Sequence, residues 1–376
     1  MSRELKYTLK IFIITRLFLT ALGYLTRTAF YPKLGLWRDQ WIYHPNPLLN
    51  LWGVWDSGWY LDIAQNGYSS ILQSDLPKRV CCGQSNFGFF PLYPSLIKLT
   101  NFAVGNYFIA GLIISNLALI LSGVFLYRLA RLNNSKKTSL RSVKYMFFFP
   151  SAFILSGVFS ESLFLLLLIA AFYFAKKKKW FLAGVAGFFL SLTKQTGLLM
   201  IIPLLYVYLK QNEFKIKKIK PDILYLSFLP LGLLFLTFYS YFLEGDPLLF
   251  FSVKATAWDV YLANPAGVFI SFMLSGKLVF KIIALYAFFL TILLVVFRKK
   301  IKTSFFLLSL IVLAVPMTTG AETFIGIIRY SSVVFPFFIL FASLTRDKNW
   351  GKFISSVLIS SQIIFMVFWS NALLVI

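Results

Sequence analysis

The chain has 376 residues, of which 59% are hydrophobic and 19% aromatic, and its formal net charge is +24. This apolar content is far above that of soluble domains, and apolar runs of about 20 residues, the length that crosses a bilayer's hydrocarbon core, recur along the chain. Composition therefore excludes a soluble globular domain. A transmembrane β-barrel would show short segments of alternating hydrophobicity, so the long apolar runs indicate an all-α polytopic membrane protein.

The positive charge does not indicate a nucleic-acid partner. Basic residues lie in short clusters between the apolar runs, as the positive-inside rule predicts, and such clusters also meet anionic lipid head groups. No nucleotide-binding motif of the GxxxxGK[ST] or Rossmann type is present. The lone His44 and the adjacent Cys81 and Cys82 offer no metal spacing. We therefore expect no cofactor and no metal.

The apolar runs predict eleven membrane helices in a single integral-membrane domain, residues 1–376. A first outer loop, residues 31–106, is long for a connection between membrane helices, and loops of that length are usually functional or disordered. Its many aromatic residues argue against disorder. The predicted helices cover residues 7–30, 107–128, 144–157, 160–175, 180–191, 195–209, 222–243, 277–297, 303–318, 331–345 and 353–374.

The basic residues predict the orientation of these helices. One set of connecting segments, together with the N-terminus, carries 25 of the 37 Lys and Arg residues, which makes that side cytoplasmic. Residues 145–175 and 180–209 lie between such clusters, so each must leave the cytoplasm and return as a short hairpin. The hairpin tips are FSES at 159–162 and LTKQTG at 192–197. Short helices that meet at polar tips suggest a cavity open to the outer face.

The stretch VWDSGWYLDIAQNGY at 54–68 places acidic residues among aromatic ones. Trp55, Trp59 and Ile63 are four apart, which predicts one stripe of a helix lying at the membrane surface. Asp56 has two interpretations: a cap for the helix start, or a general base where the outer cavity meets the lipid. Asp62 is six positions on, hence on another helical face, which favours a solvated or paired carboxylate.

A second aromatic stretch, NFGFFPLYPSL at 86–96, follows in the same loop. Its two prolines, three apart, are expected to break regular structure. The stretch is interpreted either as a rigid lid on the membrane or as the wall of a pocket that faces lipid or sugar. Phe90 and Tyr93 are its candidate substrate-binding residues.

Charged residues also occur at the hairpin tips and near the C-terminus. Glu161 and Lys194 form either a mutual salt bridge or part of a site, because ionisable residues at membrane depth are functional candidates by default. Gln195 follows Lys194 and adds a hydrogen-bonding group. Arg329, seven residues after Glu322, either extends to the interface or binds phosphate, a task suited to guanidinium.

Taken in order, these stretches resemble the PIG-V family, relatives of GPI mannosyltransferase II within the GT-C class of membrane glycosyltransferases. The likeness is carried by WDSGWYLDIAQNGY, FGFFPLYPSL, PSAFILSGVFSESLF, SLTKQTGLL and, near the C-terminus, RYSSVVFPFF at 329–338. The resemblance implies a GT-C-like helical core with a catalytic Asp in the first outer loop, matched here by Asp56. It also implies a polyprenyl-phosphate sugar donor, with mannose the first choice, transferred with inversion and without a metal. The family often has Arg at the position of Lys194.

We therefore expect transfer of a sugar to a hydroxyl of a glycan, glycolipid or protein at the outer face of a prokaryotic plasma membrane, with the N-terminus cytoplasmic. Asp56 is the expected base. Arg329, Lys194 and Tyr330 are expected to bind the donor phosphate. The alternatives are a GT-C transferase for glucose or arabinose, a lipid-linked sugar flippase, and a structural scaffold. Further substrate contacts are expected from Glu161, Trp59, Asp62, Gln195, Phe90 and Tyr93.

Overall fold

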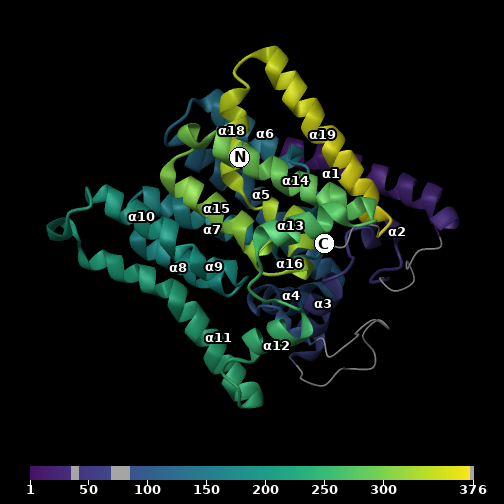
Figure 1. Ribbon diagram of the computed structural model, residues 1–376, viewed down its shortest axis with the longest axis horizontal. Helices are drawn as coiled ribbons and strands as arrows, with labels where there is room; N and C mark the ends of the chain where they lie inside the picture. Colours follow the sequence, from purple (N-terminus) through teal and green to yellow (C-terminus); the bar gives the residue numbers. More distant parts are fainter. Residues whose placement is uncertain (35–41, 69–84, 373–376) are drawn as a thin grey trace.

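The computed structural model describes residues 1–34, 42–68 and 85–372, and all regular structure within these ranges is helical. The helical class is therefore confirmed for the described chain (Figure 1). Cys81 and Cys82 lie outside these ranges. The helices of the first half are α1 (Arg3–Leu34), α2 (Pro47–Asn50), α3 (Ser57–Asn66), α4 (Leu92–Val104), α5 (Tyr107–Arg131), α6 (Lys136–Phe148), α7 (Glu161–Lys176), α8 (Trp180–Ser191), α9 (Thr196–Leu199) and α10 (Ile201–Gln211). Those of the second half are α11 (Phe228–Glu244), α12 (Leu249–Ala257), α13 (Pro265–Leu274), α14 (Leu278–Val296), α15 (Thr303–Thr318), α16 (Ala321–Ile325), α17 (Ile327–Ser331), α18 (Phe335–Leu344) and α19 (Lys348–Ser370).

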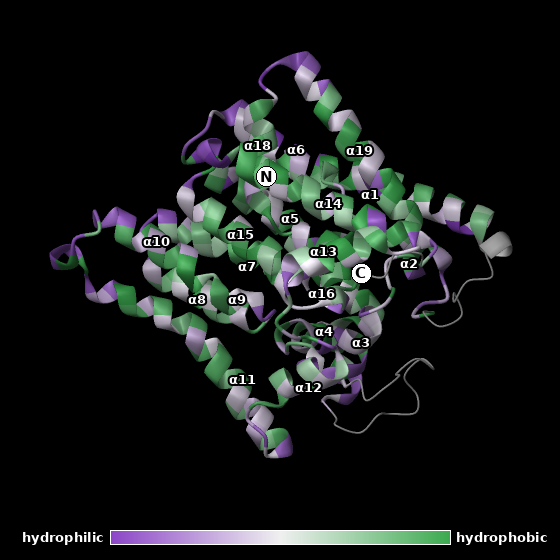
Figure 2. Ribbon diagram, in the orientation of Figure 1, coloured by the Kyte–Doolittle hydropathy of each residue, from purple (hydrophilic) through white to green (hydrophobic). Residues whose placement is uncertain are grey.

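Five of the described helices are long and apolar enough to cross a membrane, which makes the chain a helical membrane protein. They are α1, α5, α11 with the 3₁₀ turn before it, α14 and α19. The remaining apolar helices are shorter, so the count of eleven spans stays a prediction. Figure 2 shows apolar helices through the body of the molecule, with hydrophilic residues gathered at turns such as the one between α10 and α11.

The first predicted hairpin differs from the structure. A helix over 144–157 is wrong: α6 starts earlier, at Lys136, and ends at Phe148. Phe149 precedes Pro150 and is extended, because the proline ring excludes the α conformation from the residue before it. The chain then runs through a buried irregular segment to Glu161. Protein groups satisfy its backbone, for example Arg16 Nη1, which donates to the Ala152 carbonyl at 3.0 Å. Irregular backbone at membrane depth requires such partners.

The proline-containing stretch 91–96 begins a helix, whereas the sequence analysis expected broken structure. Pro91 stands at the cap position of α4 and Pro94 lies in its first turn. The first turn of a helix leaves its N–H groups without intrahelical partners, so a proline there removes no helical hydrogen bond. The stretch interpreted as a lid or a pocket wall thus contains the first residues of a 13-residue helix.

Two further predicted helices are interrupted. Residues 195–209 divide at Met200 into α9 and α10, and residues 331–345 divide into the end of α17 and α18. The first break is at an apolar residue, whereas the second begins at Ser332, three residues after Arg329. Arg329 therefore lies on a helix of only five residues.

Close helix packing joins the second hairpin to α11. A Cβ atom on Gly184 would lie 2.3 Å from the Tyr225 carbonyl, and one on Gly187 would lie 2.4 Å from Leu229. Small residues let membrane helices approach closely, which increases van der Waals contact where no hydrophobic force joins helices in lipid. The first and last helices also pack together, since α1 contacts α19 and Thr26 Oγ1 lies 3.0 Å from Ser370 Oγ (Figure 1).

Candidate functional site

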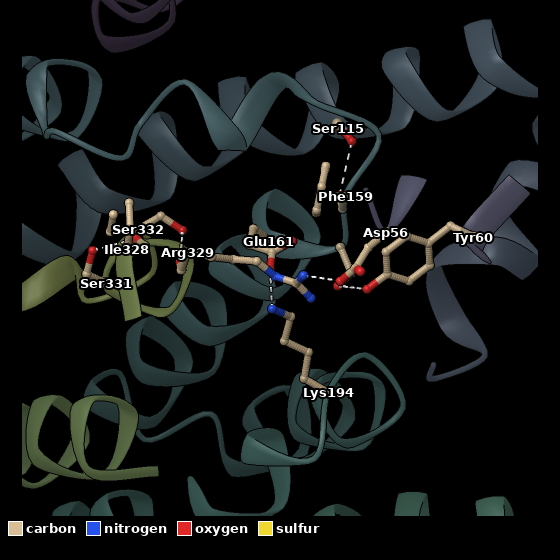
Figure 3. Close-up of polar contacts among 11 residues, drawn as sticks. Asp56, Tyr60, Ser115, Phe159, Glu161, Lys194, Ile328, Arg329, Ser331 and Ser332 are labelled. Carbon is tan, nitrogen blue, oxygen red and sulfur yellow. Dashed lines mark hydrogen bonds and ion pairs between the residues drawn. The ribbon is translucent and has the colours of Figure 1, made fainter. Parts of the chain in front are cut away.

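Four charged side chains from distant parts of the sequence meet in one cluster (Figure 3). Arg329 donates through Nη1 to Asp56 and through Nε to Glu161, and Lys194 Nζ donates to the same Glu161 oxygen. We call Asp56, Glu161, Lys194 and Arg329 the charge cluster. Of the two alternatives left open for Glu161 and Lys194, the structure shows the mutual salt bridge, which does not exclude a role in a site. Arg329 reaches inward to two carboxylates and does not extend to the interface.

Exposure distinguishes the two carboxylates. The Glu161 side chain is 0% exposed, whereas that of Asp56 is 19% exposed. Glu161 Oε1 accepts from both cations, and Oε2 is buried without a hydrogen-bond partner among the described residues. Buried charges require paired partners, which the two cations supply. Asp56 is therefore the carboxylate that a ligand can approach.

The local backbone explains the position of Asp56. Trp55 has a φ of 51°, in the left-handed region that large side chains rarely adopt, and α3 begins two residues later. Asp56 occupies the cap position of α3, but its side chain makes no capping hydrogen bond. Its carboxylate is paired with Arg329 instead. The helix-cap interpretation thus describes the position of Asp56 and not what its side chain does.

Glu161 is the first residue of α7, where the helix dipole favours a negative charge. The preceding Ser160 Oγ lies 2.8 Å from the Tyr60 hydroxyl of α3, so this contact joins the two helix starts that carry the carboxylates. The residue before Ser160 also contacts the cluster, since the Arg329 guanidinium carbon lies 5.3 Å from the centre of the Phe159 ring. The FSES tip therefore supplies both the buried carboxylate and an aromatic face for the arginine.

Lys194 lies in the turn between α8 and α9. The turn is tight, because a Cβ atom on Gly197 would lie 2.2 Å from the Leu190 carbonyl oxygen. Lys194 Nζ lies 5.4 Å from the centre of the Tyr330 ring, a cation–π distance. Tyr330 thus contacts the charge cluster through its ring.

An aromatic wall, which we define as Trp59, Phe89 and Trp258, lies beside the cluster. Trp59 stacks on Phe89 at 5.8 Å between ring centres and meets Trp258 edge-on at 5.7 Å. The predicted stripe of Trp55, Trp59 and Ile63 is wrong in one member, because Trp55 precedes α3. Partly buried aromatic rings beside carboxylates suit the apolar faces of a sugar.

Two predicted substrate contacts have internal partners. Asp62 accepts from Asn66 Nδ2 at 2.8 Å and from Asn86 Nδ2 at 2.9 Å, which agrees with the paired carboxylate expected there. Tyr93 is fully buried, and its hydroxyl lies 2.7 Å from Ser115 Oγ. In the described structure Asp62 joins two parts of the first loop, and Tyr93 holds that loop against α5.

Lys254 and Trp258 also belong to the site. In the sequence they stand with Asp259 in the last predicted outer loop, where their signal is weak. Lys254 lies in α12, and its Nζ is 3.5 Å from Gln195 Oε1 and 5.1 Å from the centre of the Phe90 ring. It lies within electrostatic reach of Lys194, Arg329 and Asp56. Burial lowers the pKa of Lys254 to about 8, and repulsion from Lys194 and Arg329 acts in the same direction.

The assembled residues can bind an anion, accept a proton at Asp56 and hold an apolar ring face. Among the described residues, no three His, Cys, Asp or Glu side chains are grouped as a metal site would require. Comparison of the chain with protein-family models and with curated proteins finds no match in either set.

Proposed function

We propose that this chain is a membrane glycosyltransferase that moves a sugar, with mannose the first choice, from a polyprenyl-phosphate donor to an acceptor hydroxyl. The observation that carries the proposal is the pairing of a partly exposed carboxylate, Asp56, with the partly exposed Arg329, beside Lys194 and an aromatic wall. A donor that arrives within the membrane suits a site built from the ends of apolar helices.

The proposed step is a single displacement at C1 of the sugar. The acceptor oxygen forms a bond to C1 as the bond from C1 to the phosphate oxygen breaks. The hydroxyl proton goes to the Asp56 carboxylate, and the electron pair of the broken bond leaves with the polyprenyl phosphate. Attack from the face opposite the leaving group inverts the anomeric centre. A positioned carboxylate contributes to such a step by removing the proton as the new bond forms.

Arg329 has a second role in this proposal. While Arg329 engages the Asp56 carboxylate, that carboxylate is not available to the acceptor hydroxyl. A donor phosphate would compete with Asp56 for Arg329, because a guanidinium can bind a phosphate through two parallel hydrogen bonds. Donor binding then frees Asp56 for the acceptor, so the donor binds first. The buried Glu161 stays paired with Lys194 and keeps this cation in place.

The finer architecture belongs to the same proposal. We infer a GT-C-like core of eleven spans, with the N-terminus cytoplasmic and the charge cluster at the outer face of a plasma membrane. The distribution of basic residues supports this orientation. The acceptor is a glycan, a glycolipid or a protein side chain.

Sugar transfer by the purified full chain in lipid tests the proposal. Polyprenyl-phosphate mannose, glucose and arabinose are offered with a panel of acceptors, and Asp56→Asn and the control Glu322→Gln run in parallel. Glu322 is an exposed carboxylate without an ion pair among the described residues. We expect wild type and Glu322→Gln to transfer mannose and Asp56→Asn to bind donor without transfer.

The other outcomes assign different functions. Transfer of glucose or arabinose in place of mannose would keep the reaction and change the donor. Full activity of Asp56→Asn would remove Asp56 as the base. Movement of a lipid-linked sugar across the bilayer without transfer to any acceptor would identify a flippase.

A further inference from the structure

The charge cluster contains as many carboxylates as cations. Arg329 and Lys194 are both engaged by Glu161, and Arg329 also by Asp56. An arriving phosphate therefore finds no surplus positive charge within the cluster. A monoanionic lipid phosphate, which gains charge as it leaves, requires a further cation nearby.

Lys254 supplies such a cation. It has no carboxylate within salt-bridge distance among the described residues, and its Nζ contacts the neutral amide oxygen of Gln195. It lies close enough to Asp56, Lys194 and Arg329 to interact electrostatically with all three. With Lys254 included, the site carries a net positive charge.

A small apolar cavity adjoins Lys254. It has a volume of about 130 Å³ and is lined by residues of α8, α9, α11 and α12, by Gln195 and by Phe90. Its lining residues are Phe90, Ser191, Gln195, Leu198, Leu199, Leu233 and Phe251. Gln195 and Phe90, which line the cavity, are also the residues that Lys254 Nζ contacts. The cation therefore stands at the edge of a hydrocarbon-lined space.

The cavity also adjoins a helix that borders lipid. Leu233 lines it from α11, a candidate membrane span on which several apolar side chains, including Leu231 and Phe235, are exposed. The cavity is smaller than a typical pocket for a whole ligand, which measures roughly 300–1,000 Å³. It suits a short stretch of hydrocarbon whose remainder continues into the bilayer.

We propose that Lys254 and Gln195, together with this cavity, bind the phosphate and the first part of the prenyl chain of a polyprenyl phosphate. The inference rests on the proposed function and adds the donor-binding residues to it. Bound in this way, the phosphate lies between Lys254 and the charge cluster, and the sugar extends toward Asp56. Trp258 follows α12 and joins the aromatic wall, so one segment contacts both the phosphate and the sugar.

Binding of lipids without a sugar tests the inference separately from transfer. The full chain in nanodiscs is titrated with a long-chain polyprenyl monophosphate, the uncharged polyprenol of equal length, and geranyl phosphate. The variants are Lys254→Gln and Lys254→Arg. Lys277→Gln is a matched control, because Lys277 Nζ also lies 5.1 Å from a phenylalanine ring, that of Phe280, but does not line the cavity.

We expect Lys254→Gln to weaken polyprenyl phosphate binding by roughly 10-fold or more. The variant loses a hydrogen bond between two charged groups, which contributes more to binding than one between neutral groups. Lys254→Arg and Lys277→Gln should bind as wild type does. Binding of polyprenol should change little in any of these variants. Melting temperatures of the variants verify that each one is folded.

A second pair of variants tests the cavity. Leu233→Trp fills it and should weaken binding of the long-chain phosphate more than that of geranyl phosphate. Leu231→Trp, on the exposed side of the same helix, should not. If wild type binds polyprenyl phosphate and neither Lys254→Gln nor Leu233→Trp weakens it, the inference is overturned and the proposed function stands. If wild type binds no polyprenyl phosphate, the proposed function itself fails.

Discussion

Arg329 and Asp56 are 273 positions apart in the sequence, yet the guanidinium donates to the carboxylate through Nη1. The same guanidinium donates to Glu161 through Nε. One side chain on a five-residue helix therefore joins the first loop to the tip of the first hairpin. In the proposed function, this arrangement would connect donor binding to the release of Asp56, and the predictions that follow test it.

Replacement of Arg329 by lysine should impair transfer by roughly 100-fold, because lysine keeps the charge but cannot contact two carboxylates or a phosphate with a planar fork. Steady-state kinetics with varied donor would measure the change in kcat and KM. Arg298→Lys is the matched control, since Arg298 also lies over a phenylalanine ring, that of Phe306. Unchanged kinetics of Arg329→Lys would contradict the assigned role.

Glu161→Gln should destabilise the protein by roughly 1–3 kcal/mol, because it removes the carboxylate that the partly buried Lys194 and Arg329 share, while Arg329 keeps Asp56 as a partner. Unfolding in detergent, followed by circular dichroism, would show this as a lower transition midpoint. The double variant Glu161→Gln with Lys194→Met should recover part of the loss, since it also removes one unpaired cation. A single variant as stable as wild type would show that the pairing with Glu161 does not stabilise the fold.

Gly197→Ala should displace the turn that carries Lys194. The added Cβ would meet the Leu190 carbonyl at 2.2 Å, and backbone cannot move away as a flexible side chain can. We expect a lower melting temperature and weaker transfer. Gly276→Ala is the control, because a Cβ there meets nothing within 4 Å. Equal behaviour of the two variants would argue against a constrained turn.

Donor binding should weaken as the pH rises above about 8. The pKa of Lys254 is lowered from its ordinary 10.5 to about 8, so the side chain is mostly charged at neutral pH and loses its charge as the pH passes that value. Affinity for polyprenyl phosphate, measured from about pH 7 to pH 9.5, should fall in wild type and fall less in Lys254→Arg, whose side chain stays charged. Identical profiles would remove Lys254 from the binding step.

Several features could be predicted from local pattern alone. Thr303–Thr318 and Trp180–Ser191 coincide with the predicted helices, because a continuous apolar run between basic clusters leaves few alternatives to a helix. The salt bridge between Glu161 and Lys194 was also predictable, since each is a charge at a hairpin tip and buried charges require a partner. The predicted site residues Asp56 and Arg329 were identified as polar side chains in apolar surroundings.

Other features depend on contacts between distant segments. The end of α6 at Phe148 and the irregular buried segment after it persist because side chains elsewhere satisfy that backbone, including Gln362, which donates to the Phe149 carbonyl at 3.0 Å. No local pattern could predict that partner. Lys254 gave only a weak signal for the same reason, since its proximity to Gln195 and Phe90 exists only after α12 packs against the 3₁₀ turn Asn86–Gly88 and against α11.

By itself, the sequence determined that this is a helical membrane protein, because most of the chain is too apolar to be stable in water and suits the hydrocarbon core of a bilayer. It also determined which few charged side chains required an explanation. Only the tertiary structure decided how they pair: that Arg329 engages both carboxylates, that Asp56 keeps partial exposure while Glu161 has none, and that Lys254 stands without a carboxylate partner among the described residues. The reason is physical, since pairing and burial depend on distances between segments that sequence separation does not encode.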